Sequence, residues 1–458
     1  MERHGTWAKL CHLMETVRST RKDSMLLVGF GFIFGASTFI FIASIFILPF
    51  LSPSRMNPLL QNNLNRFYKK FTLLHFPYYT SSTTSTGECN IFEGQWVRVS
   101  NREPYYPLGS CPYIERSPYD CYKNGRPDDA YLKWQWQWQS HPSNNGCNKN
   151  IPSILNAGDF LERLRGKKVA FSGDSLNRNM FESLACILWN AVPDKSKVSW
   201  LPGNIGHDIR GDMAVRYEAS DYNCTVGFVW SPFLVYETNP KNRRTQEGIQ
   251  KQVRETMRLD MIDPRASTFY RDADVVVFDS WHWWVGNKVH NGKDYFQEGN
   301  SLYPQLEINK AYKKALGTWR RWIDKNIDSN KTQVAFAEYS ETHYEGGQWN
   351  THGKCNRETE PIMSNETYRR RNPSRAKVLH DTLRLMKTPV LYLNISKLTY
   401  YRADGHPSIY SKNLTVQERI ASTDPQDCVH WCLPGVPDTW NELLYIALMR
   451  AGKGSFAQ

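Results

Sequence analysis

A serine at position 175 and a histidine at position 430 are of the types that carry nucleophilic catalysis, although some 250 residues separate them. Ser175 ends the run Gly173-Asp174-Ser175, and Asp427 precedes His430 by three residues. A serine nucleophile needs an imidazole to take its proton, and the imidazole needs a carboxylate to fix its tautomer. Each motif alone is weak, because Asp174, Ser175 or Asp427 can simply cap a helix. Together they predict a triad of Ser175, His430 and Asp427.

The elements around these motifs are typical of an α/β fold. An apolar run at 168–171 predicts a strand before Ser175, and helical spacing follows it. The Ser175 hydroxyl would then lie at a helix N-terminus, whose free N–H groups stabilise an oxyanion. The pattern predicts further strands at 226–229, 233–235, 273–278, 333–337 and 389–393, and helices at 306–323 and 377–385. This alternation predicts a parallel sheet with helices on both faces.

One apolar run near the N-terminus is long enough to cross a membrane. Residues 25–51 carry no charged side chain, and a helix of that length rises about 40 Å. A cleaved signal peptide is the alternative, but its apolar region is about half as long. We therefore expect a cytosolic tail at 1–24, a transmembrane signal anchor at 25–51 and a flexible stem at 52–88. A cysteine-rich unit at 89–148 and a catalytic domain at 149–458 complete the expected organisation.

Cysteine usage indicates an oxidising compartment for the residues after the apolar run. Nine of the ten cysteines follow that run, and none has the paired spacing of a structural zinc site. Five N-glycosylation sequons agree with this, and they begin at Asn223, Asn330, Asn365, Asn394 and Asn413. These features favour a single-pass type II membrane protein with a luminal body.

Charge and aromatic content restrict the partners only loosely. The formal net charge is +12, but no basic run has the spacing of a nucleic-acid motif. An acidic glycan or membrane headgroups fit this charge at least as well. Trp134, Trp136 and Trp138 alternate with glutamines, which places three indoles on one strand face. They fit either core packing or a platform for sugar rings.

Longer segments around the motifs resemble one family. These are CNIFEGQWV at 89–97, YPLGSCPYI at 106–114, NGRPD at 124–128, FSGDSLNRNMFESL at 171–184 and DCVHWCLPGVPDTWNELL at 427–444. Over residues 89–449 the chain resembles the plant trichome birefringence-like family, a PC-esterase branch of the SGNH (GDSL-like) hydrolases. The resemblance implies an SGNH-hydrolase-like parallel sheet with a disulfide-rich N-terminal unit packed on it.

The resemblance also implies an activity and a location. Members of that family are type II proteins of the Golgi membrane that O-acetylate wall polysaccharides. The expected reaction moves an acetyl group from a donor, acetyl-CoA, to pectin or to a hemicellulose such as xylan. No bound cofactor, metal or nucleic acid is expected, and the partners are the polysaccharide and the Golgi membrane. An acetylesterase with the same triad and a non-catalytic wall-polymer scaffold are the alternatives.

Several residues receive supporting roles from the resemblance. Gly173, Asp174, Arg178 and Asn179 belong to the GDSxxRN motif and would support the site or hold the donor, although Arg178 could equally brace Asp174. Low-ranking candidates for sugar contact are Trp281, His282, Trp283 and Trp284. His282 and His406 fit structural or substrate-lining roles better than metal binding. The implied disulfides are Cys89–Cys147, Cys111–Cys186, Cys121–Cys432 and Cys355–Cys428, with Cys224 free.

One position departs from the family pattern. The family often has an asparagine that donates to the oxyanion after a central strand, and this chain has Asp279 there. An ionised carboxylate only accepts hydrogen bonds and would repel an oxyanion. The donors would then be the Ser175 N–H and another group, such as Gly203 or Gly211. Alternatively, Asp279 contacts sugar hydroxyls.

Overall fold

The computed structural model describes most of the chain after residue 89. The described residues are 90–114, 117–138, 152, 154–201, 213–218, 222–238, 255–348, 351–362, 368 and 373–457. All of them belong to one compact unit, Tyr79–Gln458. The expected tail, membrane anchor and stem lie outside these residues. Within them, no helix has both the length and the apolar character needed to span a bilayer.

A seven-stranded sheet forms the centre of the described residues, with the order β13-β12-β9-β3-β6-β5-β4. Its strands β3, β6, β9, β12 and β13 run parallel, whereas β4 and β5 are antiparallel additions at one edge. The strands are β3 (Lys168–Gly173), β4 (Val198–Trp200), β5 (Met213–Tyr217), β6 (Cys224–Trp230), β9 (Val275–Phe278), β12 (Gln333–Ala337) and β13 (Val390–Leu393).

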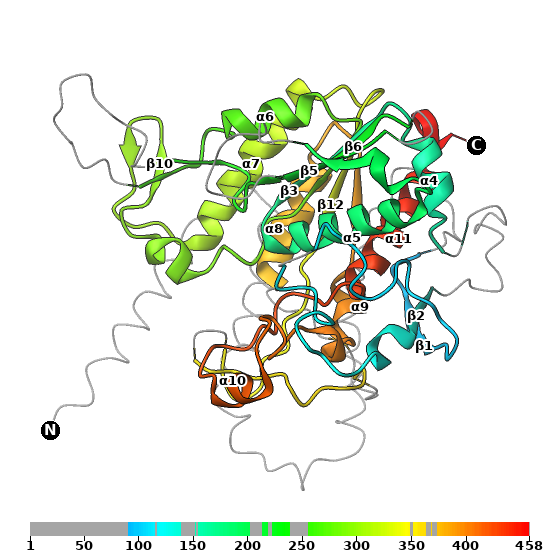
Figure 1. Cartoon of the computed structure of the whole chain (residues 1–458). Helices are drawn as coiled ribbons and strands as arrows, with labels where there is room; N and C mark the ends of the chain where they lie inside the picture. The colour runs from blue at the N-terminus through cyan, green and yellow to red at the C-terminus, as the bar shows by residue number, and fades with distance from the viewer. Residues whose placement is uncertain are drawn as a thin grey trace, which may run out of the picture. The chain divides into compact units, whose positions relative to one another are not determined.

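Helices cover both faces of this sheet (Figure 1). Along β9, Val275 and Val277 join one hydrophobic core, while Val276 and Phe278 join the other. Because successive strand residues point to opposite faces, such an uninterrupted apolar strand needs cover on both sides. The first core includes α4 (Ala157–Arg163), α5 (Ser175–Ala191), α9 (Ser396–Tyr400) and α11 (Val436–Ala451), and the second includes α6 (Pro264–Arg271), α7 (Ile308–Asn326) and α8 (Pro373–Arg384). The predicted parallel-rich α/β fold is confirmed.

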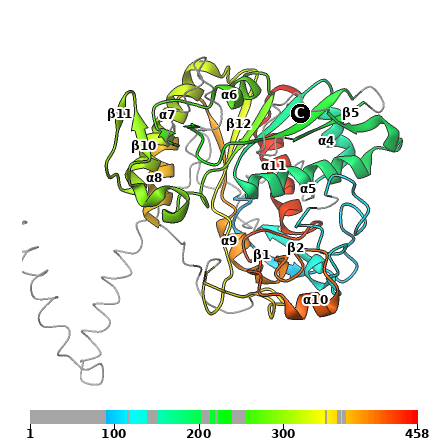
Figure 2. The ribbon, with the colours of Figure 1, turned by 60° about the vertical axis from the view of Figure 1, so that its left-hand side comes forward.

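Smaller units complete the fold. The N-terminal part forms the antiparallel pair β1 (Gly94–Arg98) and β2 (Trp134–Trp138). In both views this pair lies on the same side of the main sheet as α9 and α10 (Val416–Ala421) (Figure 2). A second small sheet contains β7 (Tyr236–Glu237), β8 (Met257–Arg258), β10 (Phe296–Glu298) and β11 (Ser301–Leu302).

The three tryptophans of β2 pack inward rather than forming a platform for sugars. Trp134 and Trp136 are 6% and 2% exposed, and Trp138 packs partly buried against the first core. Trp136 lies opposite Trp96 of β1, with ring centroids 5.6 Å apart. The indoles therefore fix the N-terminal unit onto the α/β body.

One predicted strand is wrong. Residues 233–235 form a turn, and the neighbouring strand β7 begins only at Tyr236. Leu234 has a φ of +62°, a left-handed conformation that interrupts an extended chain. Phe233, Leu234 and Val235 are nevertheless buried. An apolar triplet signals burial equally well in a turn, so its composition did not identify its conformation.

Candidate active site

The turn between β3 and α5 presents the serine. Asp174 caps α5, with its Oδ1 accepting a hydrogen bond of 2.9 Å from the Leu176 N–H. Ser175 begins the helix and is only partly buried, unlike Asp174 and Leu176 on either side of it. A Cβ atom added at Gly173 would lie 1.7 Å from Asp279 Oδ1. Only glycine lets the chain pass that close to the end of β9.

Asp279, directly after β9, holds this turn by a hydrogen bond. Its Oδ1 accepts a 2.8 Å hydrogen bond from the Asp174 N–H, and the residue is 5% exposed. Burial and the nearby Asp174 carboxylate raise the pKa of Asp279 well above its ordinary value. Burial opposes ionisation of Asp174 too, but bonds to His282, Leu176 and Asp279 lower its pKa. Asp279 therefore holds a proton more tightly than Asp174 does, and a protonated carboxyl can accept through one oxygen and donate through the other. The raised pKa of Asp279 thus reduces the repulsion expected from an ionised carboxylate at this position.

The structure brings the three predicted catalytic side chains together. His430 Nε2 lies 2.6 Å from Ser175 Oγ, and His430 Nδ1 lies 2.8 Å from Asp427 Oδ2. Asp427 Oδ1 also accepts the backbone N–H groups of Val429 (3.2 Å) and His430 (3.0 Å). The carboxylate, the imidazole and the hydroxyl therefore form one continuous series of hydrogen bonds.

Electrostatics suit this series of hydrogen bonds. Burial alone would raise the pKa of Asp427, but the charge and hydrogen bonds of His430 outweigh it and lower that pKa to about 2. Burial lowers the pKa of His430, and the Asp427 carboxylate more than compensates, so the net shift is upward from 6.5. The pairing makes His430 a stronger base, and Asp427 fixes its Nδ1 as the protonated nitrogen.

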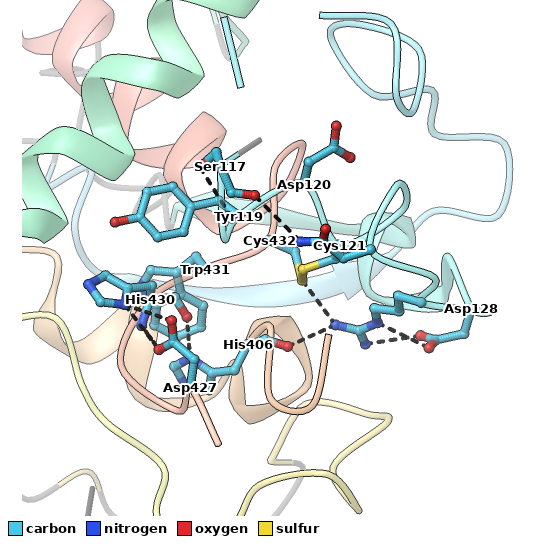
Figure 3. The surroundings of a disulfide bond; sticks show 12 residues. Ser117, Tyr119, Asp120, Cys121, Asp128, His406, Asp427, His430, Trp431 and Cys432 are labelled. Atoms are coloured by element: carbon cyan, nitrogen blue, oxygen red, sulfur yellow. Dashed lines mark hydrogen bonds and ion pairs between the residues drawn. A yellow bond between two sulfur atoms is a disulfide. The ribbon is translucent and has the colours of Figure 1, made fainter. Parts of the chain in front are cut away.

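The loop that carries His430 is irregular and is anchored by distant residues. Asn179 Oδ1 accepts from the Trp431 N–H (2.8 Å), and its Nδ2 donates to the Trp431 carbonyl (3.1 Å). Disulfides Cys121–Cys432 and Cys355–Cys428 attach both ends of the loop. Figure 3 shows the first of these beside His430 and Trp431. Asn179 thus holds the base in place, as one of its two expected roles required.

Three of the four implied disulfides lie in the described residues. They are the two just named and Cys111–Cys186, which joins the N-terminal unit to α5. Cys224 is buried and free, as expected. The pair Cys89–Cys147 lies outside the described residues, as do Gly203 and Gly211, the suggested oxyanion donors.

Two family models match the chain. Residues 151–447 match the GDSL/SGNH-like acyl-esterase family found in Pmr5 and Cas1p, and residues 87–141 match the PMR5 N-terminal domain. The chain is 43% identical to protein trichome birefringence-like 4 of Arabidopsis thaliana, over 81% of this chain and 78% of that relative. The chain belongs to the trichome birefringence-like family of PC-esterases.

Two further relatives from Arabidopsis thaliana are longer than this chain. Protein trichome birefringence is 46% identical over 80% of this chain and 57% of its own length. Protein trichome birefringence-like 1 is 45% identical over 80% of this chain and 62% of its own length. The matched portion thus spans less than two thirds of each.

Of the two roles left open for Arg178, the brace on Asp174 is wrong. Its Nε donates to Glu182 Oε1 at 2.7 Å, rather than bracing Asp174. Glu182 is 1% exposed, and its Oε2 accepts from the Ser117 hydroxyl at 2.9 Å. Glu182 thus ties the nucleophile helix to the N-terminal unit, and Arg178 pairs with its buried carboxylate from one turn away on the same helix.

Tyr119 is a site residue that the sequence did not indicate. Its ring centroid lies 5.1 Å from that of His430, and its hydroxyl lies 3.4 Å from the Ser175 carbonyl oxygen. A single tyrosine within an aromatic-rich, loop-rich segment carries no periodic signal. Only the pairing of Cys121 with Cys432 suggested that this segment lies close to the site.

The aromatic run after β9 divides into different roles. Trp281 and Trp284 are each 1% exposed and belong to the second core, so the prediction that they bind substrate is wrong. His282 supports the nucleophile turn, because its backbone N–H donates to Asp174 Oδ2 at 3.1 Å. Its Nε2 lies 2.9 Å from the Ser340 carbonyl, so this ring is structural. Of the four, Trp283 alone lines an open groove.

That groove has a volume of about 540 Å³ and includes Arg178, one helical turn from Ser175. Trp230 and Trp283 meet edge to face in its wall, with ring centroids 5.0 Å apart. The Lys288 ammonium lies 4.4 Å from the Trp283 ring centroid. Aromatic faces with charged groups around them suit carbohydrate rings.

Proposed function

We propose that this protein is a polysaccharide O-acetyltransferase that uses Ser175 as nucleophile, His430 as general base and Asp427 as the residue that orients the base. The observation that carries the proposal is the unbroken hydrogen-bonded relay between these three side chains, with a half-buried hydroxyl at the start of α5. Membership of an acyl-esterase family supports acyl chemistry at this serine.

The proposed reaction has two displacements. Ser175 Oγ attacks the acetyl carbon of a thioester, acetyl-CoA, while its proton moves to His430 Nε2. The carbon–sulfur bond breaks, and the leaving thiolate takes that proton. A sugar hydroxyl then attacks the acetyl-serine and gives its proton to His430. The ester bond to Ser175 breaks, and the proton returns to Oγ. In both steps the Ser175 N–H, unpaired at the helix start, is the proposed oxyanion donor.

The groove beside Arg178 is the proposed site for the acceptor. Its wall contains Trp230 and Trp283, and Arg178 extends toward it from the nucleophile helix. Holding a polymer hydroxyl there in place of water would favour transfer over hydrolysis. Pectin and hemicelluloses such as xylan are the proposed acceptors.

The proposed location is the Golgi membrane, with a type II anchor at 25–51 and a luminal catalytic body. Three disulfides in the described residues support an oxidising compartment. Sequons at Asn223, Asn330 and Asn413 are exposed, which leaves them open to glycosylation. Asn394 is 4% exposed, so the folded protein protects that sequon.

An acetylesterase with the same residues is the second candidate, because the family description names acyl-esterases. The two activities separate in one assay. The protein is incubated with acetyl-CoA and a panel of unacetylated and acetylated pectic, xylan and mannan oligosaccharides. Mass spectrometry then measures the mass of each product. Transfer predicts acetyl gain that depends on donor and acceptor. Acetyl loss without gain would establish the esterase.

A non-catalytic scaffold is tested by Ser175→Ala in the same assay and in a complementation experiment. The transferase proposal predicts loss of acetylation with an unchanged melting temperature. Full function of the alanine variant would overturn it.

A further inference from the structure

Two histidines lie behind the loop that carries the catalytic base. His343 Nδ1 and His406 Nε2 are 2.7 Å apart. On the outer side of one ring, His343 Nε2 lies 2.8 Å from the carbonyl oxygen of Tyr400. On the outer side of the other, His406 Nδ1 lies 2.6 Å from the carbonyl oxygen of His430. The chain of contacts therefore ends on the peptide of the base itself.

The two carbonyl oxygens at the ends of this hydrogen-bonded series fix the number of protons that the two imidazoles carry. A carbonyl oxygen can only accept, so His343 Nε2 and His406 Nδ1 must each carry a hydrogen. A neutral imidazole has a single N–H. Two neutral rings would thus point lone pairs at each other across 2.7 Å. We infer that His343 and His406 share one additional proton between their inner nitrogens and form a singly charged pair that positions His430.

The surroundings can hold such a charge. His406 is 2% exposed and stacks on Trp431, with ring centroids 4.0 Å apart and planes 27° apart (Figure 3). The face of an indole stabilises a cation. Trp431 is held in turn by its Nε1, which donates to Ser340 Oγ at 2.8 Å. The nearby charges of Arg402 and Asp404 pair with each other.

The charged neighbours limit the pair to one proton. Burial lowers the pKa of His406 well below its ordinary value, and the charge on His343 lowers it further. The hydrogen bond to the His430 carbonyl and the Asp427 carboxylate oppose this lowering of the His406 pKa, whereas a charge on His430 adds to it. Arg126 faces the same residue from the N-terminal unit, where its Nη1 donates to the His406 carbonyl at 3.1 Å. A charge on one ring therefore opposes protonation of the other, so the pair resists a second proton.

The consequence for His430 is both mechanical and electrostatic, and this role rests on the proposed function. A charged donor makes a stronger hydrogen bond to the His430 carbonyl than a neutral one. The positive charge also repels an imidazolium at His430, which opposes the upward shift that Asp427 gives the pKa of His430. His343 and His406 are therefore positioning residues. The rate should therefore depend on pH through the protonation of the pair as well as through that of His430.

Nitrogen NMR tests the shared proton without reference to activity. The full-length protein is labelled with ¹⁵N in the imidazoles of its 12 histidines. The signals of the pair are assigned as those that disappear in the variants His343→Gln and His406→Asn. The inference predicts protonated outer nitrogens and two inner nitrogens with intermediate shifts at neutral pH. Both rings neutral, with one outer nitrogen unprotonated, would overturn it.

The matched variants His406→Asn and His406→Leu test the role. The asparagine amide can still donate toward the His430 carbonyl but cannot share a proton, whereas leucine can do neither. We expect His406→Asn to lower kcat by about tenfold with little change in KM and to change the pH profile of the rate, because the pair can no longer share a proton. His406→Leu should lose more. A wild-type pH profile in His406→Asn would show that the pair does not position His430 for catalysis. The NMR experiment tests the shared proton independently of this kinetic result.

Discussion

The two halves of the candidate site are built in opposite ways. The nucleophile turn from Gly173 to Ser175 joins a buried parallel strand directly to a helix, and Asp279 and His282 after the neighbouring strand β9 hold it by hydrogen bonds. The loop with Asp427 and His430 has no regular structure of its own. It is held by disulfides and by side chains from distant parts of the chain. The position of the nucleophile thus follows from regular strands and a helix of the main sheet, whereas the position of the base depends on disulfides and side chains that anchor an irregular loop.

The largest expected effect comes from removing either half. Ser175→Ala and His430→Ala should each lower kcat/KM by about 10⁴-fold or more, because proton transfer needs both groups. The double variant should fall no further than the single ones, since the residues act as a unit. Steady-state acetyl transfer measures this. Additive losses would show that the two halves work independently.

Removing a disulfide should affect catalysis more when the bond anchors the loop of the base than when it anchors the nucleophile helix. Cys355→Ser with Cys428→Ser should reduce the free energy of unfolding by about 2–5 kcal/mol and also lower kcat, because the link lies next to Asp427. The matched control is Cys111→Ser with Cys186→Ser, since Cys186 lies within α5, far along from Ser175. The control should lose stability of the same order with a smaller loss of kcat at a temperature where both remain folded. Equal losses of kcat would contradict the contrast.

The same contrast explains what could be predicted from the sequence. The strand 333–337 and the Gly173-Asp174-Ser175 junction were predictable, because strand and helix periodicity is local. The run 233–235 was not, since one left-handed residue turns an apolar stretch away from a strand. Trp281 and Trp283 look alike in sequence, yet the first is buried and the second lines the groove. Tyr119 lies next to His430 only in the folded protein, so no sequence pattern could predict this contact.

Asn179 is the direct link between the halves and should show an intermediate effect. Asn179→Ala leaves the Trp431 N–H and carbonyl without their partners, which costs about 1–3 kcal/mol of folding free energy. It should lower kcat while KM changes little, because the base shifts and the groove does not. Denaturant unfolding and kinetics measure both quantities. Asn179→Asp, which keeps the acceptor for the Trp431 N–H, should retain more activity than alanine. The reverse order would contradict this account of Asn179.

Asp279 acts only on the nucleophile half, and its replacement should have the smallest effect on rate. Its raised pKa means that the folded state binds this proton more tightly than the unfolded chain, whose carboxyl has an ordinary pKa near 3.8. Stability contributed by the neutral form is complete below that value and is lost as pH rises toward the folded pKa. Asp279→Asn has no proton to lose.

The amide variant should therefore melt higher than the wild type above pH 4, and the difference should grow as pH rises. Thermal unfolding across a pH series measures it, with activity retained within severalfold. A melting-temperature difference that does not change with pH would show that Asp279 is ionised in the folded protein.

The central claim is tested most directly by trapping the acyl-enzyme. The full-length protein is mixed with isotope-labelled acetyl-CoA without acceptor, quenched and digested, and the peptide that carries Ser175 is examined by mass spectrometry. The account predicts one labelled acetyl group on Ser175 that disappears when an oligosaccharide acceptor is added and never forms in His430→Ala. Full transferase activity with no label on Ser175 would contradict it.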